Sequence, residues 1–361
     1  MIKYILKRLA LIPVTLLGIL LVNFVFVQLA PGGPVEQMMM KLDGQQTQAT
    51  GRFSGSGQKM MPNRKTSSKY QGAQGVRQDL IEQLNKQFGF DKSLFERFGL
   101  MIKNYAVFDF GKSFYQDKKV VDLIKEKLPV SISLGIWSTL LIYLISIPLG
   151  IKKAVSNGSK FDMGTSFLIV IGYAVPAFLF AMLLVILFAG GAYLQWFPLR
   201  GIVSDNWEAL SWFGKTKDYL WHMVLPVLAM VAGGFAGLTM LTKNSFMDEI
   251  KKNYVVTARA KGLSEKQVLY GHIFRNAMLI IIAGFPATLV GMLFTGSVLI
   301  EVIFSLDGLG LLGYESVLNR DYPVIFATLY IFALLGLVLN LLSDLTYRLI
   351  DPRIDFERRV K

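Results

Sequence analysis

Long apolar runs separated by short polar segments occupy most of the chain. Six of these runs reach the length of about 20 residues that a helix needs to cross a bilayer. They cover residues 9–30, 131–151, 165–192, 223–242, 278–300 and 324–346. The pattern predicts an all-α integral membrane protein with about six membrane-spanning helices.

Lysine and arginine are concentrated in alternate connections between these runs. They gather before residue 9 and in residues 152–160, 243–275 and 348–361. Cytoplasmic loops carry this excess, so both termini and residues 243–277 are predicted to be cytoplasmic. The net charge of +13 therefore requires no nucleic-acid partner.

The first long connection, residues 31–130, is predicted to lie outside the cytoplasm, since long loops cross the membrane regardless of charge. Residues 44–75 are rich in Gln, Gly, Ser and Lys, and this composition predicts a mobile segment. An amphipathic helix follows, whose apolar face could rest on the bilayer surface or on the ends of the spans, and its polar face of mixed charge favours the spans. That face contains Leu94, Phe98, Met101, Ile102 and Tyr105.

Two short patterns imitate nucleotide-binding loops. Gly111, Lys112 and Ser113 match the end of a Walker A loop, but Ala106 stands where that loop begins with glycine. The glycines of residues 308–313 match G-x-G-x-x-G, yet they follow a membrane span and not a β-strand. We interpret the second pattern as a flexible external turn and expect no nucleotide at either place.

The residues of an enzyme active site are also missing from the sequence. The chain has no cysteine, and its two histidines, His222 and His272, fall on opposite predicted sides of the membrane. Neither G-x-S-x-G nor H-E-x-x-H occurs. We therefore expect no catalytic residue, no metal site and no cofactor in this chain.

The polar stretch YVVTARAKGLSEKQVLYGHIFRNA, residues 254–277, has the pattern of two helices joined by a turn. Gly262 suits the left-handed position that ends a helix. Ser264 and Gln267 form a capping box for the next one. About 35 residues between two spans are too few for a DNA-binding domain. The stretch is instead predicted to offer a surface knob to a partner protein.

These residues resemble the EAA loop of binding-protein-dependent ABC transporter permeases, in the version found in peptide transporters. Val256, Thr257 and Ala258 stand where the general pattern has a glutamate and two small residues, and Gly262 is its glycine. Residues 5–34 resemble the first span of that family, FDFGKSF its DFG-x-S loop and LIDPRID its tail. The expanded external segment is most similar to that of the Yej-type members of the oligopeptide and dipeptide permeases.

The resemblance implies a type I importer permease with no ATPase of its own, in a bacterial inner membrane. It implies a heterodimer with a second homologous permease, a cytoplasmic ATPase that binds ATP and Mg, and a periplasmic binding protein that delivers oligopeptides. Peptide antibiotics resembling microcin C are a further implied cargo. The implied divisions are a first span (1–30), an external segment (31–130), a permease domain (131–346) with the coupling loop (243–277), and a tail (347–361).

Two sets of site residues follow from the resemblance and from the pattern of small and polar side chains. The ATPase-coupling set is Thr257, Ala258, Arg259, Ala260, Lys261, Gly262, Leu263 and Ser264. The translocation-path set is Thr288, Gly291, Thr295, Gly296, Ser297 and Glu301. Arg259 and Lys261 either face an acidic rim or are solvated, and the hydroxyls either line a path or bond their own helix. Glu301 is either a gate residue or a solvated carboxylate.

Other transporter classes stay open at this point. A permease for nickel or a sugar would use the same machinery. A proton-driven secondary transporter would need acidic side chains inside the spans, whereas Glu301 and Asp344 lie only near span ends.

Overall fold

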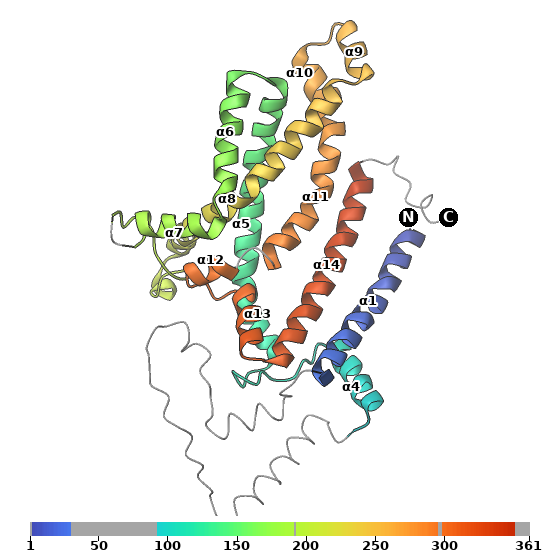
Figure 1. Ribbon diagram of the computed structural model, residues 1–361, viewed down its shortest axis with the longest axis vertical. Helices are drawn as coiled ribbons and strands as arrows, with labels where there is room; N and C mark the ends of the chain where they lie inside the picture. The colour runs from blue at the N-terminus through green and yellow to red at the C-terminus, as the bar shows by residue number, and fades with distance from the viewer. Residues whose placement is uncertain (1, 30–91, 191–192, 295–297, 351–361) are drawn as a thin grey trace, which may run out of the picture. The chain divides into compact units, whose positions relative to one another are not determined.

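The computed structural model describes residues 2–29, 92–190, 193–294 and 298–350 of the 361-residue chain. In this part the regular structure is helical, with one isolated antiparallel bridge between Lys112 and Lys119. Figure 1 shows the helices. They are α1 (Ile2–Leu29), α4 (Leu94–Ala106), α5 (Val120–Val155), α6 (Lys160–Ala174), α7 (Ala177–Phe188), η2 (Trp207–Ala209), α8 (Trp212–Ile250), α9 (Asn253–Ala260), α10 (Glu265–Val268), η3 (Leu269–Ile273), α11 (Phe274–Phe294), α12 (Val298–Ile303), α13 (Leu309–Leu318) and α14 (Tyr322–Ile350). The predicted all-α class is confirmed.

Among the described residues, five helical stretches are long and apolar enough to cross a membrane, or six if one bent pair counts as a span. The bent pair is α6 and α7, which meet at an angle of 92°. Val175 adopts an extended conformation there, because the ring of Pro176 disfavours a helical residue before it. The expected span over residues 165–192 is therefore bent, and it counts as a span only if α6 and α7 are taken together.

Two helices extend well beyond the lengths that their apolar runs predicted. α5 has 36 residues and α8 has 39, which correspond to roughly 54 and 58 Å at the rise of an α-helix. A bilayer core is about 30 Å thick. α5 thus begins at Val120 and not near residue 131, and α8 carries its polar end on to Ile250.

The described residues divide into two compact units, which we treat separately. One contains residues 1–12, 124–314 and 331–361, and the other contains 13–123 and 315–330. In the first unit, α5, α7, α8 and α12 enclose an apolar core. Its most buried side chains are Leu134, Ile142, Ala181, Leu225, Ala229, Ile300, Phe304 and Leu306.

In the second unit, α4 is the amphipathic helix that its sequence predicts. Ser93 and Glu96 form a capping box at its start, and Tyr105 is buried near its end. The ring of Phe98 lies 5.3 Å from the ring of Phe24 in α1. The apolar face of α4 therefore packs on a spanning helix, as expected. Residues 44–75, which were predicted to be mobile, lie outside the described residues.

The residues that imitate a Walker A loop attach the segment before α5 to the start of α14. The Ser113 hydroxyl donates to Asp321 Oδ2 at 2.5 Å, and the backbone N–H of Phe114 donates to Asp321 Oδ1 at 3.1 Å. The Ser113 oxygen also accepts the backbone N–H of Gln116 at 2.9 Å. Both Ser113 and Asp321 are buried, so this motif serves as a structural anchor.

We expect Ser113→Ala to loosen this anchor by about 1–3 kcal/mol, the usual penalty for leaving buried hydrogen-bonding groups without a partner. Limited proteolysis of the purified protein should then cut residues 107–119 faster. Ser156→Ala is the matched control, because the Ser156 hydroxyl bonds only the Lys152 carbonyl of its own helix. Equal cutting rates in the two variants would contradict the anchor.

Candidate functional site: a helical hairpin between α8 and α11

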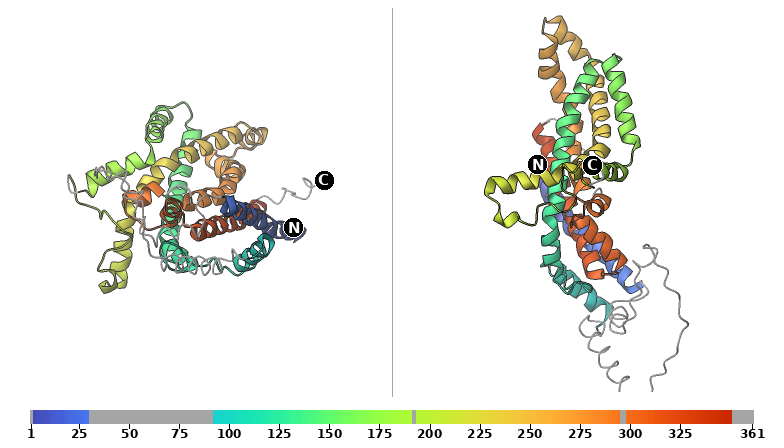
Figure 2. Two further views of the ribbon diagram at one scale, coloured as in Figure 1. Left: turned by 60° about the horizontal axis from the view of Figure 1, so that its bottom comes forward. Right: turned by 90° about the vertical axis from the view of Figure 1, so that its left-hand side faces the viewer.

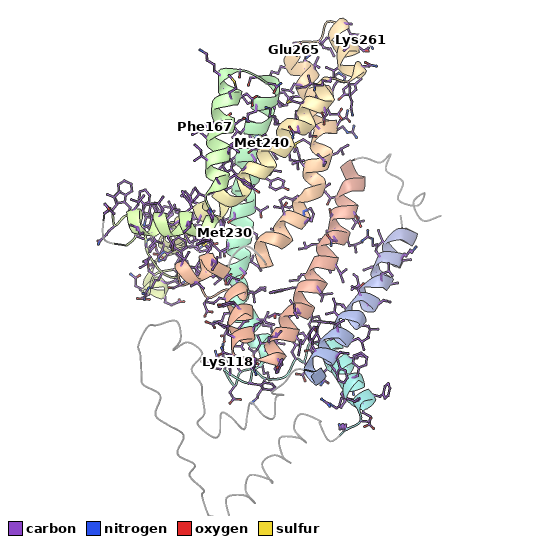
Figure 3. All side chains as sticks on the ribbon, viewed as in Figure 1. Lys118, Phe167, Met230, Met240, Lys261 and Glu265 are labelled. Atoms are coloured by element: carbon purple, nitrogen blue, oxygen red, sulfur yellow. The ribbon has the colours of Figure 1, made fainter. Side chains whose placement is uncertain are left out.

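Residues 251–273, called the insert below, connect α8 to α11. They form α9, a turn, α10 and η3. Figure 3 shows Lys261 and Glu265 at the far end of this connection, beyond the ends of α8 and α11. The connection between α5 and α6 lies at the same end of this unit (Figures 1 and 2).

The turn has the geometry that its sequence predicts. Gly262 has a φ of +84°, and its N–H donates to the Arg259 carbonyl at 2.9 Å. Ser264 and Gln267 form both bonds of the capping box of α10. A Cβ atom on Gly262 would meet nothing within 4 Å, so the backbone of the turn faces open space.

The second helix of the insert contains one feature that the sequence did not predict. Leu269–Ile273 forms a π-helical turn between α10 and α11. Such turns are often found at functional sites. No proline interrupts this stretch, and its only small residue is Gly271, so the pattern alone does not identify it.

One face of the hairpin packs inward. Val255, Ala258 and Val268 are buried against Phe246 of α8, and Leu263 packs partly against the same cluster. The expectation that the Ala258 side chain belongs to the partner-facing surface is therefore wrong. The reason is helical periodicity, because residues 255 and 258 share one face of α9.

The other face of the hairpin is exposed. It presents six members of the predicted coupling set, namely Thr257, Arg259, Ala260, Lys261, Gly262 and Ser264. Arg259 donates to Glu265 through Nε and Nη2 at 2.8 and 2.9 Å. The hydrogen bonds that Arg259 donates to the Glu265 carboxylate raise the pKa of Arg259. Arg259 thus has a partner on α10 within an exposed, solvated face, and its contact with an acidic rim of another protein stays a prediction.

Exchanging the two charges tests whether this pair holds the hairpin together. Arg259→Glu alone would place two carboxylates opposite each other and should speed amide hydrogen exchange in residues 253–268. Adding Glu265→Arg should restore the slow exchange, because the pair reforms with reversed direction. Exchange that is unchanged in the single variant would show that the pair contributes nothing to the hairpin, as solvent screening permits for exposed pairs.

Three of the six predicted path residues, Thr288, Gly291 and Glu301, lie in the described part of the chain. The Thr288 hydroxyl donates to the Gly284 carbonyl of its own helix at 3.0 Å, and Gly291 is half-buried in α11. Thr295, Gly296 and Ser297 lie outside the described residues. A path along α11 stays a prediction.

Glu301 is not the solvated carboxylate that was one of its two expected roles, and its role as a gate stays a prediction. Its side chain is fully buried, and its Oε2 atom accepts the backbone N–H of Leu311 at 2.6 Å. Gly308, expected in a flexible turn, directly precedes α13, and Gly310 and Gly313 lie within that helix. A carboxylate at a helix N-terminus satisfies N–H groups that the helix leaves unpaired. Glu301 therefore fixes the start of α13, and a solvated carboxylate and a flexible turn are both wrong.

Possible metal ligands do not gather into a cluster in the described ranges. No group of three or more His, Cys, Asp or Glu side chains there is placed to hold a metal ion. The Nδ1 atom of His222 lies 2.8 Å from the Asp218 carbonyl in the preceding turn of α8. That contact ties the imidazole to its own helix.

Comparison with known proteins identifies the family to which this chain is similar. Residues 146–356 match the family described as the binding-protein-dependent transport system inner membrane component. The chain is 61% identical to the peptidoglycan transport system permease protein YejB of Agrobacterium fabrum, with 99% of each chain covered. It is 56% identical to the inner membrane ABC transporter permease protein YejB of Escherichia coli O157:H7, again over 99% of each chain.

More distant proteins match as well. The oligopeptide transport system permease protein AppB of Bacillus subtilis is 33% identical, over 99% of this chain and all of that protein. Among solved structures, the inward-facing MetNI methionine ABC transporter matches with a TM-score of 0.49 and 14% identity, over 64% of this chain and 97% of that one. By its family match and these relatives, the chain belongs to the inner membrane components of binding-protein-dependent transport systems and is an ABC transporter permease subunit, not an enzyme.

Proposed function

We propose that this permease imports oligopeptides and that the exposed face of its insert is where a cytoplasmic ABC ATPase docks and moves it. The observation that carries the coupling role is the small-residue surface of the hairpin. Ala260 and Gly262 are exposed there, and no atom lies within 4 Å of a Cβ on Gly262. Small residues allow a partner to approach the backbone closely.

The free energy that transport requires supports a partner protein as its source. Switching a two-state path from 1:99 to 99:1 requires about 5.5 kcal/mol of differential binding. The sequence contains no complete nucleotide-binding motif, and the residues that imitate one, Gly111 to Ser113, anchor the external segment to Asp321. In this proposal the partner ATPase holds ATP and Mg, and the insert transmits the resulting displacement to α8 and α11.

The remaining partners follow from the family and the charge pattern. A second, homologous permease completes the path as a heterodimer, and a periplasmic binding protein delivers the cargo. Both termini and the insert lie in the cytoplasm in this arrangement, in agreement with the lysine and arginine distribution.

The cargo assignment is based on relatives. Their names refer to peptidoglycan and oligopeptide transport, which supports peptides as the cargo class here. Peptide antibiotics resembling microcin C would enter by the same route. Nickel and sugars are the alternative cargoes of related machinery.

Uptake by membrane vesicles that contain the complete transporter tests the cargo. A labelled tripeptide should accumulate with ATP, and unlabelled peptides, including muropeptide-type fragments, should compete with it. Deleting the gene should also protect cells from a peptide antibiotic of the microcin C type. Competition by nickel or by a sugar, without competition by peptides, would overturn the assignment.

A further inference from the structure

A buried ion cluster joins three helices close to the insert. Lys153 of α5 and Lys243 of α8 both contact Asp162 of α6. The Lys153 Nζ atom lies 2.9 Å from Asp162 Oδ1, and the Lys243 Nζ atom lies 2.7 Å from Asp162 Oδ2. Lys153 is fully buried, and Asp162 is only 4% exposed.

The groups of this cluster are extensively bonded. The Lys153 ammonium also donates to the Asp162 carbonyl, the Thr165 hydroxyl and the Ser166 hydroxyl, each at 2.8 Å. Asp162 Oδ2 accepts the Gly158 N–H at 3.1 Å. Buried ion clusters of this kind contribute little net stability compared with apolar side chains of similar volume. What they do impose is a fixed distance and direction between the bonded helices.

α5 and α8 are also in direct contact along the same seam. The Ser146 hydroxyl donates to the Phe235 carbonyl at 3.0 Å. One turn further, a Cβ atom on Gly150 would lie 2.6 Å from Thr242 Cβ and 2.8 Å from the Thr239 carbonyl oxygen. A side chain of any size at Gly150 would force the two helices apart. The seam therefore allows little sliding between them.

The part of α8 that holds this cluster also supports the insert. Phe246, one turn beyond Lys243, is fully buried among residues that include Ile151 of α5 and Val255 and Ala258 of α9. The neighbouring Ser245 hydroxyl donates to the Ala277 carbonyl of α11 at 2.7 Å. One turn of α8 thus faces α6 through Lys243 and the hairpin through Phe246.

We propose that Asp162, clamped by Lys153 and Lys243, is a positioning residue that makes α5, α6 and the insert move as one body during transport. This inference rests on the proposed coupling role of the insert and names the residues that carry its displacement into the membrane. Without the clamp, the insert would still bind its partner, but α6 would no longer follow it.

The test uses the complete transporter in proteoliposomes, with peptide uptake and ATP hydrolysis measured together. Asp162→Asn would leave the buried Lys153 ammonium and the partly buried Lys243 ammonium with one neutral acceptor and could prevent folding. A triple variant, Lys153→Met, Asp162→Leu and Lys243→Met, removes all three charges, and such replacements are commonly tolerated. We expect this variant to assemble and hydrolyse ATP, while peptide uptake per ATP falls about fivefold or more, within the usual range for coupling between sites.

A second readout follows the movement itself. The chain has no cysteine, so Lys160→Cys on α6 and Lys266→Cys on α10 give two unique exposed labelling sites. In the unmodified chain, the distance between spin labels at these two sites should be the same without nucleotide as with trapped ATP. In the triple variant, the distribution of label distances should become broader. Glu208→Gln is the control, because it removes an exposed ion pair with Lys215.

Three outcomes would decide the matter. Uptake per ATP equal to that of the unmodified chain in an assembled triple variant would overturn the clamp, and so would a label distance that changes with nucleotide in the unmodified chain. An unmodified complex that hydrolyses ATP without importing peptide would instead refute the proposed function. The label distances would still decide whether α6 and the insert move together.

Discussion

Replacing Gly262 by aspartate is expected to abolish ATP-driven uptake while the chain still folds and enters the membrane. The φ of +84° at this position favours glycine, and other residues cost about 1–2 kcal/mol there, with Asn and Asp at the low end. A Cβ atom there meets no atom of the chain within 4 Å, so the backbone of the turn leaves room for a side chain. In the proposed function, the carboxylate would lie on the surface where the ATPase docks.

Two further variants separate shape, charge and strain. Gly262→Asn adds nearly the same volume without charge, and we expect it to weaken ATPase capture less than aspartate does. Gly111→Asp is the matched control, since Gly111 also has a positive φ of +77° and open space around it, in the external segment. Co-purification of the ATPase is the measurement. Full capture by Gly262→Asp would remove the turn from the docking surface.

Replacing Gly308 by alanine is expected to have the second large effect. The added Cβ would lie 2.5 Å from the carboxyl carbon of Glu301, which is too close for any real contact. The carboxylate cannot move cheaply, because it is fully buried and bonded to Leu311. Overpacking of this kind costs about 1–3 kcal/mol, and displacement of the buried charge adds to it. The thermal unfolding temperature of the purified protein should drop.

A double-mutant cycle identifies the cause. Glu301→Ala removes the clashing group and leaves the Leu311 N–H without that acceptor, at about 1–3 kcal/mol. Gly308→Ala should then cost little when added to Glu301→Ala, so the two effects should be far from additive. Additive losses would show that the close approach of Gly308 to Glu301 is unimportant for stability.

The sequence predicted the elements that depend on local patterns. Apolar run lengths identified the membrane helices, and the glycine and the capping box placed the turn and the start of α10. Residues far apart in sequence were not predictable in this way. Glu301 looked exposed because it follows an apolar run, and only the folded backbone brings Leu311 to it.

The ion cluster of Lys153, Asp162 and Lys243 was also not predictable from local sequence patterns. Lys153 and Lys243 belong to cation-rich connections, where the positive-inside pattern already explains each of them. Asp162 follows Ser159 at the spacing of a helix cap, a pattern that also fits the observed bond from its N–H to the Ser159 hydroxyl. Nothing local indicates that the three side chains meet, because α5, α6 and α8 come together only through tertiary packing.

The central claim is that this chain is a gate driven from outside by a partner ATPase. Its most direct test reconstitutes the chain with its permease partner and binding protein in liposomes, with and without the ATPase subunit, and measures labelled peptide inside. The account predicts accumulation only when the ATPase and ATP are both present. Accumulation against a gradient without the ATPase would contradict it.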